Sequence, residues 1–232
     1  MEWNKQILQK PMWNNEISNR EQKERIAKEI ARIANDGDVI GFGSGSTSYL
    51  AAIEIANRIQ NEGIKITAIP TSYEIKMLCT YLNIPTATLE EKKPDWCFDG
   101  ADEVDYDNWM IKGRGAAMFN EKLNIKCSNK TYILVDESKI VNRLGSKFPV
   151  PVECTPKAIN LVKEEIYKQG AHNVELRLAQ KKDGPVITEN GNIILDAWFD
   201  NIDETLERRL KNITGVVETG LFIGYNVEIV AQ

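Results

Sequence analysis

The chain has 232 residues, of which 42% are hydrophobic and 27% are charged, and its formal net charge is −5. This length predicts one or two domains, and the composition excludes collagen-like, disordered and disulfide-scaffold proteins. The acidic balance leaves no broad basic surface, so we expect neither nucleic acid nor a membrane as a partner. No apolar run is long enough to cross a bilayer and the first residues, MEWNKQILQK, lack a secretion signal, so we expect a cytoplasmic protein.

The first half of the chain alternates helices with short apolar strands. Ser18 and Glu21 have the spacing of a capping box, and the helix that follows should stop at Asp36-Gly37. Asn14-Asn15 and the charged run Glu21–Lys28 are expected to be solvated. Strands are expected at 39–42, 64–69, 96–98 and 132–135, and helices near 49–56, 73–82 and 116–124. Strands that are apolar on both faces and alternate with helices predict an α/β fold with a Rossmann-like, mostly parallel sheet.

The pattern changes from Phe148 onward. Strands are expected at 150–154, 174–178, 193–195 and 216–221, and helices at 157–168 and 203–211. Residues 186–188 lead through Asn190-Gly191, a tight turn, into the strand at 193–195. This β-α-β-β-α-β order predicts a split-βαβ, ferredoxin-like domain. We therefore expect a catalytic domain of residues 1–147 plus 222–232, with a last strand at 227–230 that returns to the first sheet. Residues 148–221 should form a smaller α+β domain.

The four cysteines, Cys79, Cys97, Cys127 and Cys154, are far apart in the sequence and form no CxxC pair, and His172 is the only histidine. A structural zinc site is therefore not expected. We expect the thiols to be free and buried as small apolar groups, and His172 to lie at the surface.

Three polar clusters follow the predicted strands, at Gly43–Thr47, Asp99–Asp105 and Asp136–Lys139. Ligands of such sheets bind beyond the carboxyl ends of the strands, so these clusters predict a binding site at one edge. The first cluster combines small residues, hydroxyls and a helix start, which favours an anion site over a flexible turn. It is neither a dinucleotide fingerprint, which would need glycine at Ser46, nor a Walker A loop, which would need a Gly-Lys pair.

The second cluster places four acidic residues in seven positions. One interpretation is a divalent-metal loop and the other is acid/base chemistry on hydroxyl groups. The calcium-loop template fails, because Val104 and Met110 stand where it needs glycine and glutamate. A solvated acidic turn would normally follow an exposed element, whereas this cluster follows the apolar Trp96–Phe98, which favours an active site.

A third stretch, from Met110 to Lys122, carries Lys112 and Arg114 among glycines, followed by Glu121 on a helix. Glycines let a ligand approach the backbone closely, and the cations suit a phosphate or an enediolate oxygen. Taken alone, Glu121 would be interpreted as a surface residue, because glutamate is rarely buried. Lys139 is equally ambiguous on its own.

Together these residues give the chain a familiar pattern: it resembles the type A family of ribose-5-phosphate isomerases. The resemblance rests on an ordered set of motifs, namely GSGST at 43–47, DGADEVD at 99–105, KGRGAA at 112–117, NEKL at 120–123, DESK at 136–139, FPVPVE at 148–153 and TENGN at 188–192. It runs from about the first helix to the last strand. Two positions depart from the family pattern. Ser44 stands where threonine is common, and Arg114 replaces the middle glycine of KGGG, where it either crowds the loop or adds a cation.

The resemblance implies reversible isomerisation of D-ribose 5-phosphate and D-ribulose 5-phosphate through a cis-enediol(ate), in the non-oxidative pentose phosphate pathway, with no metal or cofactor. It implies a homodimer or homotetramer whose partner is a small sugar phosphate. Glu121 is implied as the general base, with Asp99, Asp102 and Lys112 as further catalytic residues. The implied substrate-binding set is Ser44, Gly45, Ser46, Thr47, Asp99, Gly100, Ala101, Asp102, Lys112, Gly113, Arg114, Gly115 and Lys139.

Two other functions stay open on the sequence. A non-catalytic sugar-phosphate sensor could use the same anion site, although we find no helix-turn-helix or basic segment for an output. A sugar-phosphate deaminase or lactonase would be expected to place a histidine near the acidic residues, and His172 lies far from them in the sequence.

Overall fold

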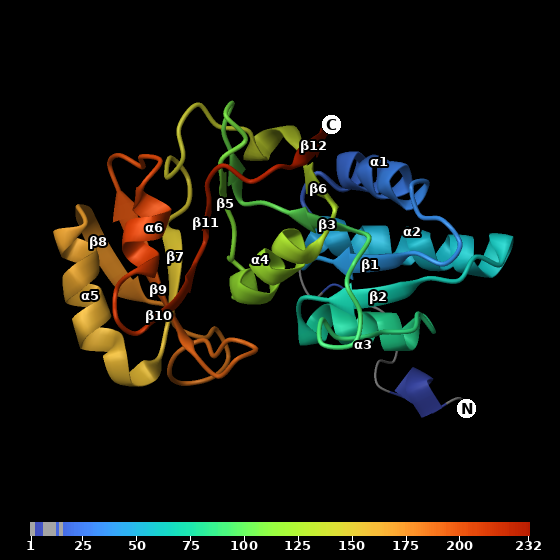
Figure 1. Ribbon diagram of the computed structural model, residues 1–232, viewed down its shortest axis with the longest axis horizontal. Helices are drawn as coiled ribbons and strands as arrows, with labels where there is room; N and C mark the ends of the chain where they lie inside the picture. The colour runs from blue at the N-terminus through green and yellow to red at the C-terminus, as the bar shows by residue number, and fades with distance from the viewer. Residues whose placement is uncertain (1–2, 7–12, 14–15) are drawn as a thin grey trace. The chain divides into compact units, whose positions relative to one another are not determined.

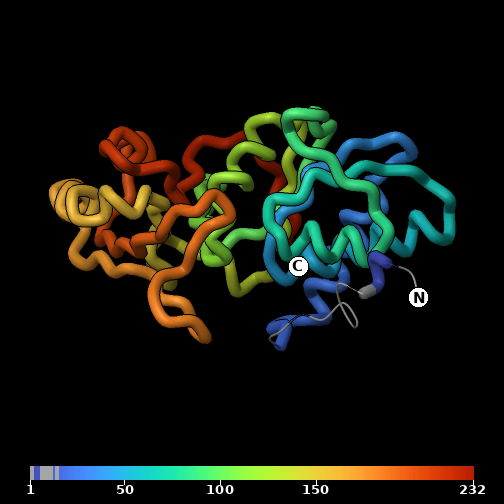
Figure 2. Tube along the Cα trace, turned by 90° about the horizontal axis from the view of Figure 1, so that it is seen from below, coloured from blue at the N-terminus to red at the C-terminus, as the bar shows by residue number. Residues whose placement is uncertain are grey.

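A computed structural model describes residues 3–6, 13 and 16–232 of the chain (Figures 1 and 2). The pair Asn14-Asn15 lies outside these residues. The chain divides into two compact units. The first unit comprises residues 1–100, 120–138 and 226–232, and the second comprises residues 101–119 and 139–225. Among the described residues, no helix is both long enough and apolar enough to cross a membrane.

The first unit is built on a five-stranded parallel sheet with the order β12-β6-β3-β1-β2 (Figure 1). Its strands are β1 (Val39–Phe42), β2 (Thr67–Pro70), β3 (Trp96–Gly100), β6 (Lys130–Val135) and β12 (Glu228–Ala231). The parallel sheet and the return of the last strand are both confirmed. Because all the strands run the same way, their carboxyl ends lie at one edge of this sheet.

Helices cover both faces of this sheet. One face packs against α1 (Arg20–Ala31), α2 (Ser46–Glu62) and α3 (Tyr73–Tyr81), and Ile40 and Phe42 of β1 belong to that core. Gly41 points the other way, toward α4 (Met118–Cys127). A Cβ atom at Gly41 would lie 2.6 Å from the Cys97 Cβ and 3.1 Å from the Asn124 Nδ2. The absence of a side chain at Gly41 therefore lets α4 dock closely on the sheet.

The start of α1 differs from the expected capping box. Asn19 is the N-cap residue, in a left-handed conformation with φ of 50°, and its side chain makes no capping bond. Ser18 instead accepts a hydrogen bond from the Lys23 ammonium at 3.2 Å. Lys23 is buried and lies 3.5 Å from the Asp136 carboxylate. The expectation of a fully solvated charged run is therefore wrong at Lys23, whose charge is matched inside the unit.

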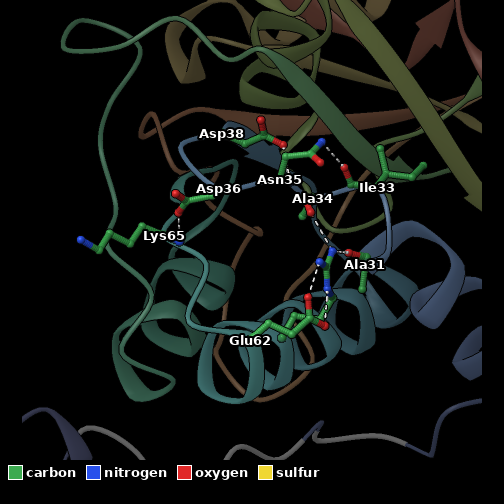
Figure 3. A network of polar contacts seen from close by, with 9 residues as sticks. Ala31, Ile33, Ala34, Asn35, Asp36, Asp38, Glu62 and Lys65 are labelled. Carbon is green, nitrogen blue, oxygen red and sulfur yellow. Dashed lines mark hydrogen bonds and ion pairs between the residues drawn. The ribbon is translucent and has the colours of Figure 1, made fainter.

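The link from α1 to β1 is fixed by polar contacts (Figure 3). The Arg58 guanidinium of α2 donates to the carbonyls of Ala31 and Ala34, both at 2.7 Å. Ala31 is the last residue of α1, and Ala34 lies in the turn that follows the helix. Beyond the helix, the Asp38 carboxylate accepts from the Asn35 N–H at 2.8 Å. These bonds fix the point at which β1 begins.

The second unit contains a four-stranded antiparallel sheet with the order β10-β7-β9-β8. Its elements are β7 (Val150–Cys154), η3 (Pro156–Ala158), α5 (Ile159–Lys168), β8 (Ala171–Leu176), β9 (Ile193–Phe199), α6 (Leu206–Lys211) and β10 (Val216–Thr219). This order confirms the ferredoxin-like arrangement. Residues 186–188, which lead into β9, form no strand of their own, and single bridges join Leu178 to Pro185 and Ile187 to Ile193. The turn at Asn190-Gly191 is present, with the Gly191 N–H donating to the Thr188 carbonyl at 3.0 Å.

A third sheet, which the sequence pattern did not predict, also belongs to the second unit. It joins β4 (Glu103–Val104), β5 (Met110–Ile111) and β11 (Leu221–Phe222) in antiparallel pairs. Two-residue strands are too short to show a period in the sequence. This sheet holds Asp102 and Lys112 close together, because the Asp102 N–H donates to the carbonyl of Ile111 at 2.8 Å.

Candidate active site

The serine-rich loop leaves the carboxyl end of β1 and bonds to its neighbours in the first unit. The Gly43 N–H donates to the Phe98 carbonyl at 2.8 Å, and the Ser44 N–H donates to the Asp99 carboxylate at 3.2 Å. The Ser44 hydroxyl lies 2.8 Å from the hydroxyls of both Thr71 and Ser72. The loop is therefore a fixed part of the strand edge and not a flexible turn.

The same loop leads into the first turn of α2, a helix of 17 residues that begins at Ser46. Gly45 is its N-cap residue, with φ of 96°, a conformation that favours glycine. Because glycine offers no capping side chain, the first backbone N–H groups of α2 are available to an anion. Thr47 is buried beside them.

Asp99 ends the buried part of β3 and is itself only 2% exposed. Besides the Ser44 N–H, its carboxylate accepts the N–H of Gly100 at 2.8 Å. A Cβ atom at Gly43 would lie 2.2 Å from the Asp99 Oδ1, so only glycine allows this contact. The serine-rich loop and the Asp99 carboxylate therefore pack directly against each other, so that acceptor oxygens lie beside the hydroxyls of the loop.

The other acidic residues of the 99–105 cluster belong to the second unit, and each has different hydrogen-bond partners. The Asp102 carboxylate accepts the Arg114 N–H at 3.1 Å. Asp105 accepts the N–H groups of Asp107 and Trp109 at 3.0 and 2.9 Å, which closes a turn. Burial raises the pKa of the Asp105 carboxyl, and these two bonds only partly offset that rise.

Glu103 is fully buried, and its carboxylate holds the loop that precedes β7. It accepts backbone N–H groups from Gly145 at 2.6 Å and from Phe148 at 2.9 Å, as well as from Lys147. A carboxylate surrounded by three backbone donors has a structural role. The acidic cluster therefore contains a residue with a structural role, Glu103, which its composition did not distinguish from Asp99 and Asp102.

Glu121 lies in the first turn of α4 and is 4% exposed. The surface position that its residue type alone would favour is therefore wrong. Its neighbour Asn120 donates to the carbonyl of Thr71 at 2.9 Å, and Asn124 donates to the carbonyl of Ile69 at 2.9 Å. Both amides tie α4 to the carboxyl end of β2. Since the Thr71 hydroxyl also contacts Ser44, Glu121 belongs to the same strand edge as the serine-rich loop.

Lys112 follows β5 in the second unit and is 2% exposed. Its backbone N–H donates to the Gly220 carbonyl at 2.8 Å, and its ammonium lies 5.5 Å from the centre of the Phe222 ring. A Cβ atom at Gly220 would lie 2.2 Å from the Lys112 carbonyl oxygen, so the two backbones meet closely. The face of an aromatic ring attracts a cation, which stabilises the buried Lys112 ammonium.

The glycine loop after Lys112 departs from regular backbone. Gly113 has φ of 98°, and a Cβ atom there would lie 2.6 Å from the Met118 sulfur. Its carbonyl accepts the Ala116 N–H at 3.0 Å, which forms a tight turn. The Arg114 side chain is exposed at the tip of this turn, so it does not crowd the loop. Of the two alternatives for Arg114, the added cation is the one compatible with this position.

Lys139 is the last residue of η2 (Glu137–Lys139) and is partly buried in the second unit. Its ammonium lies 4.9 Å from the centre of the Phe148 ring. The next residue, Ile140, bridges to Val104 of β4. Lys139 is thus attached to the same short sheet that carries Asp102 and Lys112.

The expected site residues therefore fall into two groups. The first unit holds Ser44, Gly45, Ser46, Thr47, Asp99, Gly100 and Glu121, and the second holds Ala101, Asp102, Lys112, Gly113, Arg114, Gly115 and Lys139. Thr71, Ser72 and Asn120 join the first group, and the sequence analysis missed them. Thr71 and Ser72 follow β2 in the way that the other polar clusters follow their strands, so the same signal was present.

The remaining candidates are His172 and the cysteines. His172 is exposed and lies 3.5 Å from Asp200. Burial raises the pKa of Cys79 to about 12 and that of Cys154 to about 11, so these thiols stay protonated. No group of three or more potential metal ligands comes together within residues 3–6, 13 and 16–232.

Comparison with known proteins identifies related sequences. The sequence model of the family described as Ribose 5-phosphate isomerase A (phosphoriboisomerase A) matches residues 67–232. Ribose-5-phosphate isomerase A of Methanocaldococcus jannaschii is 46% identical over 209 residues, covering 89% of this chain and 92% of that protein. The matched regions include residues of both units.

Solved structures give the same result. The structure of ribose 5-phosphate isomerase A from Methanocaldococcus jannaschii matches with a TM-score of 0.89 at 42% identity, covering 92% of this chain and 95% of the other. The structure of a D-ribose-5-phosphate isomerase in complex with phospho-erythronic acid matches with a TM-score of 0.87 at 39% identity, covering 93% and 95%. The likeness therefore extends over nearly the whole length of both chains.

Proposed function

The chain belongs to the ribose 5-phosphate isomerase A family, and from that premise we propose how its own residues carry the reaction. It is an aldose–ketose isomerase that interconverts D-ribose 5-phosphate and D-ribulose 5-phosphate in the pentose phosphate pathway. The observation that carries the assignment of the base is the burial of the Glu121 carboxylate on a helix tied to the serine-rich strand edge.

Glu121 is the general base in this proposal. Isomerisation removes the proton from C2 of the open-chain aldose and returns a proton to C1, through a cis-enediol(ate). A single carboxylate suits both steps, because it takes the proton from one carbon and delivers it to the adjacent one. Its position in the first turn of α4, next to the anchored Asn120, limits its movement. Such a positioned base contributes roughly 10²–10⁴-fold to the rate.

Lys112 stabilises the oxygen that gains negative charge when the proton leaves. A preorganised cation serves this purpose best where water is excluded, and Lys112 is buried. Asp99 and Asp102 accept hydrogen bonds from the sugar hydroxyls, assist opening of the furanose ring, and move the proton between O1 and O2. Both aspartates already accept backbone N–H groups, which fixes the direction of their oxygens.

The phosphate group is bound by Ser44, Gly45, Ser46 and Thr47 together with Lys139. Hydroxyls, the N–H groups at the start of α2 and a lysine are suitable donors for a dianion. Gly100, Ala101 and the loop Gly113–Gly115 complete the substrate contacts through their backbones. Binding energy from the phosphate, which does not react, positions C1 and C2 at the base.

The oligomeric state and the cellular location of the protein remain predictions. Family resemblance favours a homodimer or homotetramer with a sugar phosphate as its small-molecule partner, acting in the cytoplasm. Size-exclusion chromatography with light scattering of the full chain checks the first of these.

The test of the base is Glu121→Gln, with Glu21→Gln as its matched control. Glu21 also lies in the first turn of a helix of the first unit but is exposed. After EDTA treatment, we expect the wild-type protein and E21Q to convert ribose 5-phosphate to the ketose. We expect E121Q to lose about 10²–10⁴-fold in kcat.

Binding and turnover are separated with phospho-erythronic acid, the ligand named for the related complex. Its carboxylate is planar and anionic, as is the O1–C1–C2–O2 group of the enediolate. Calorimetry should show that E121Q binds it within about threefold of wild type. Near-normal turnover of E121Q would exclude Glu121 as the base, and binding without conversion by the wild type would favour the sensor alternative.

A further inference from the structure

Arg177, directly after β8, joins the antiparallel sheet of the second unit to the glycine loop that follows Lys112. Its Nε donates to the Asp196 Oδ2 at 2.8 Å, and a terminal nitrogen pairs with the other oxygen of the same carboxylate. The second terminal nitrogen donates to two backbone carbonyls, those of Gly113 at 2.8 Å and Arg114 at 2.9 Å. Both side chains of the pair are 15% exposed.

These contacts fix the direction of two successive peptide groups. In a trans peptide the N–H points opposite to the C=O, and no cis peptide bond occurs among the described residues. With the carbonyls of Gly113 and Arg114 directed at the guanidinium, the N–H groups of Arg114 and Gly115 must point to the opposite side. The first of them indeed donates to the Asp102 carboxylate at 3.1 Å.

We propose that Arg177 is a positioning residue for the isomerase reaction. It directs the N–H groups of Arg114 and Gly115 to one side of the loop, beside Lys112. There the Arg114 N–H holds the Asp102 carboxylate, and the Gly115 N–H is directed to the same side for an oxygen of the substrate. A charged donor on each carbonyl also polarises the peptide, which makes its N–H a better donor. This role rests on the proposed binding of substrate by residues 112–115.

The planar fork of arginine is needed for this arrangement. One edge of the guanidinium pairs with the Asp196 carboxylate, which leaves the remaining nitrogen aimed at the loop. A lysine would supply one point charge and could not make both sets of contacts with the same geometry. The Asp196 carboxylate on β9 therefore sets the angle at which Arg177 meets the loop.

Arg209 offers a matched control in the same unit. It also pairs with an aspartate, Asp203, at 3.0 and 3.1 Å, and its Nε donates to the Gln169 side chain at 3.1 Å. Asp203 lies just before α6 and Gln169 directly follows α5, both away from the glycine loop in the sequence. The Arg209–Asp203 pair is more exposed than the Arg177–Asp196 pair, so loss of Arg209 should cost less stability. It should leave the direction of the loop peptides unchanged.

The experiment compares Arg177→Met, Arg177→Lys and Arg209→Met in steady-state isomerisation of ribose 5-phosphate, at a temperature at which circular dichroism shows all of them folded. We expect R177M to lower kcat/KM about 100-fold, R177K about tenfold, and R209M less than twofold. Hydrogen exchange measured by mass spectrometry gives a readout independent of activity. Amides of residues 113–116 should exchange at least tenfold faster in R177M than in wild type, and remain unchanged in R209M.

The proposal is overturned if R177M and R177K keep kcat/KM within twofold of wild type, or if R209M loses as much as R177M. Should R177M fail to fold, R177K decides the question by the same two readouts. If the wild type formed no ketose, the proposed function would fail, and hydrogen exchange alone would decide whether Arg177 orders the loop. Unchanged exchange at residues 113–116 in R177M would then overturn it.

Discussion

The two units hold their site residues by different means. In the first unit the residues sit at the carboxyl ends of parallel strands and bond to the adjacent strand end, as the Ser44 N–H does to the Asp99 carboxylate. In the second unit they lie next to two-residue strands, in a turn or in η2, and charged side chains from distant parts of the sequence hold the surrounding segments. Glu103 binds the loop at 145–148, and Arg177 binds Gly113 and Arg114. The first group is therefore fixed mainly by contacts between neighbouring strand ends, and the second mainly by charged side chains that reach it from elsewhere in the chain.

The largest effect on activity is expected for Gly43→Ala in the first unit. The new Cβ would lie 2.2 Å from the Asp99 Oδ1 and 2.6 Å from the Asp99 Cα, and backbone cannot yield as a flexible side chain can. We expect kcat/KM to fall at least 100-fold, because the loop and Asp99 must separate. Steady-state kinetics checks this.

Gly63→Ala is the control for a general loss of stability. Gly63 caps the end of α2 with φ of 73°, and a Cβ atom there would meet open space. The strained conformation should cost about 1 kcal/mol in the free energy of unfolding while kcat/KM stays within twofold. Normal activity of G43A, or equal losses in both variants, would contradict close packing as the device of the first unit.

Glu103→Gln tests the buried charge of the second unit. The amide keeps one acceptor oxygen, but its NH₂ group faces an N–H donor where the carboxylate accepted a bond. We expect the free energy of unfolding to fall by about 3 kcal/mol, measured by urea denaturation. The exposed Glu204→Gln should change it by less than about 0.5 kcal/mol. A loss below about 1 kcal/mol in E103Q would mean that the carboxylate does not hold its loop.

Asp136→Asn tests how far the stability of the first unit also depends on a buried charge. Burial alone would raise the pKa of Asp136, but hydrogen bonds from Ser138 and Asn19 and the charge of Lys23 outweigh it, so the pKa lies below its usual range. A lowered native pKa stabilises the fold above the unfolded pKa of about 4, and this contribution is lost as the pH falls through the native pKa.

The wild type should therefore lose stability below about pH 4, and D136N should show a flatter acid limb in thermal unfolding followed from pH 7 to pH 2. At pH 7 we expect D136N to be less stable by about 2 kcal/mol, because Lys23 loses its counter-charge. The exposed Asp183→Asn serves as control. Parallel pH curves for wild type and D136N would rule out this contribution.

The sequence predicted the first unit better than the second, for a physical reason. Strands such as Val39–Phe42 are buried on both faces and flanked by helices, so their apolar runs and the polar residues behind them are visible in the chain. The buried position of Glu121 has no such signal, because its contacts depend on where Asn120 meets Thr71. The resemblance to the family supplied what the pattern of residues could not.

The second unit's part of the site was least predictable. Strands β4 and β5 are two residues long, and they are defined by their pairing with each other and with β11, which lies about 110 positions later in the chain. The same holds for Arg177, whose partners Gly113 and Arg114 are 64 and 63 positions away. Contacts of this kind leave no periodicity in the sequence. Only the folded structure therefore shows that Glu103 has a structural role and that its neighbour Asp102 contacts the glycine loop.

In the proposed mechanism Glu121 moves the proton between C2 and C1, and an isotope label on C2 follows that proton. With ribose 5-phosphate deuterated at C2 and present at saturating concentration, NMR follows the loss of the label from C2 to C1 of the ketose or to solvent. We expect wild type and E21Q to remove the deuterium from C2 rapidly. We expect E121Q, which still binds phospho-erythronic acid, to remove it at least 100-fold more slowly. Loss of the label at the wild-type rate in E121Q would contradict this mechanism.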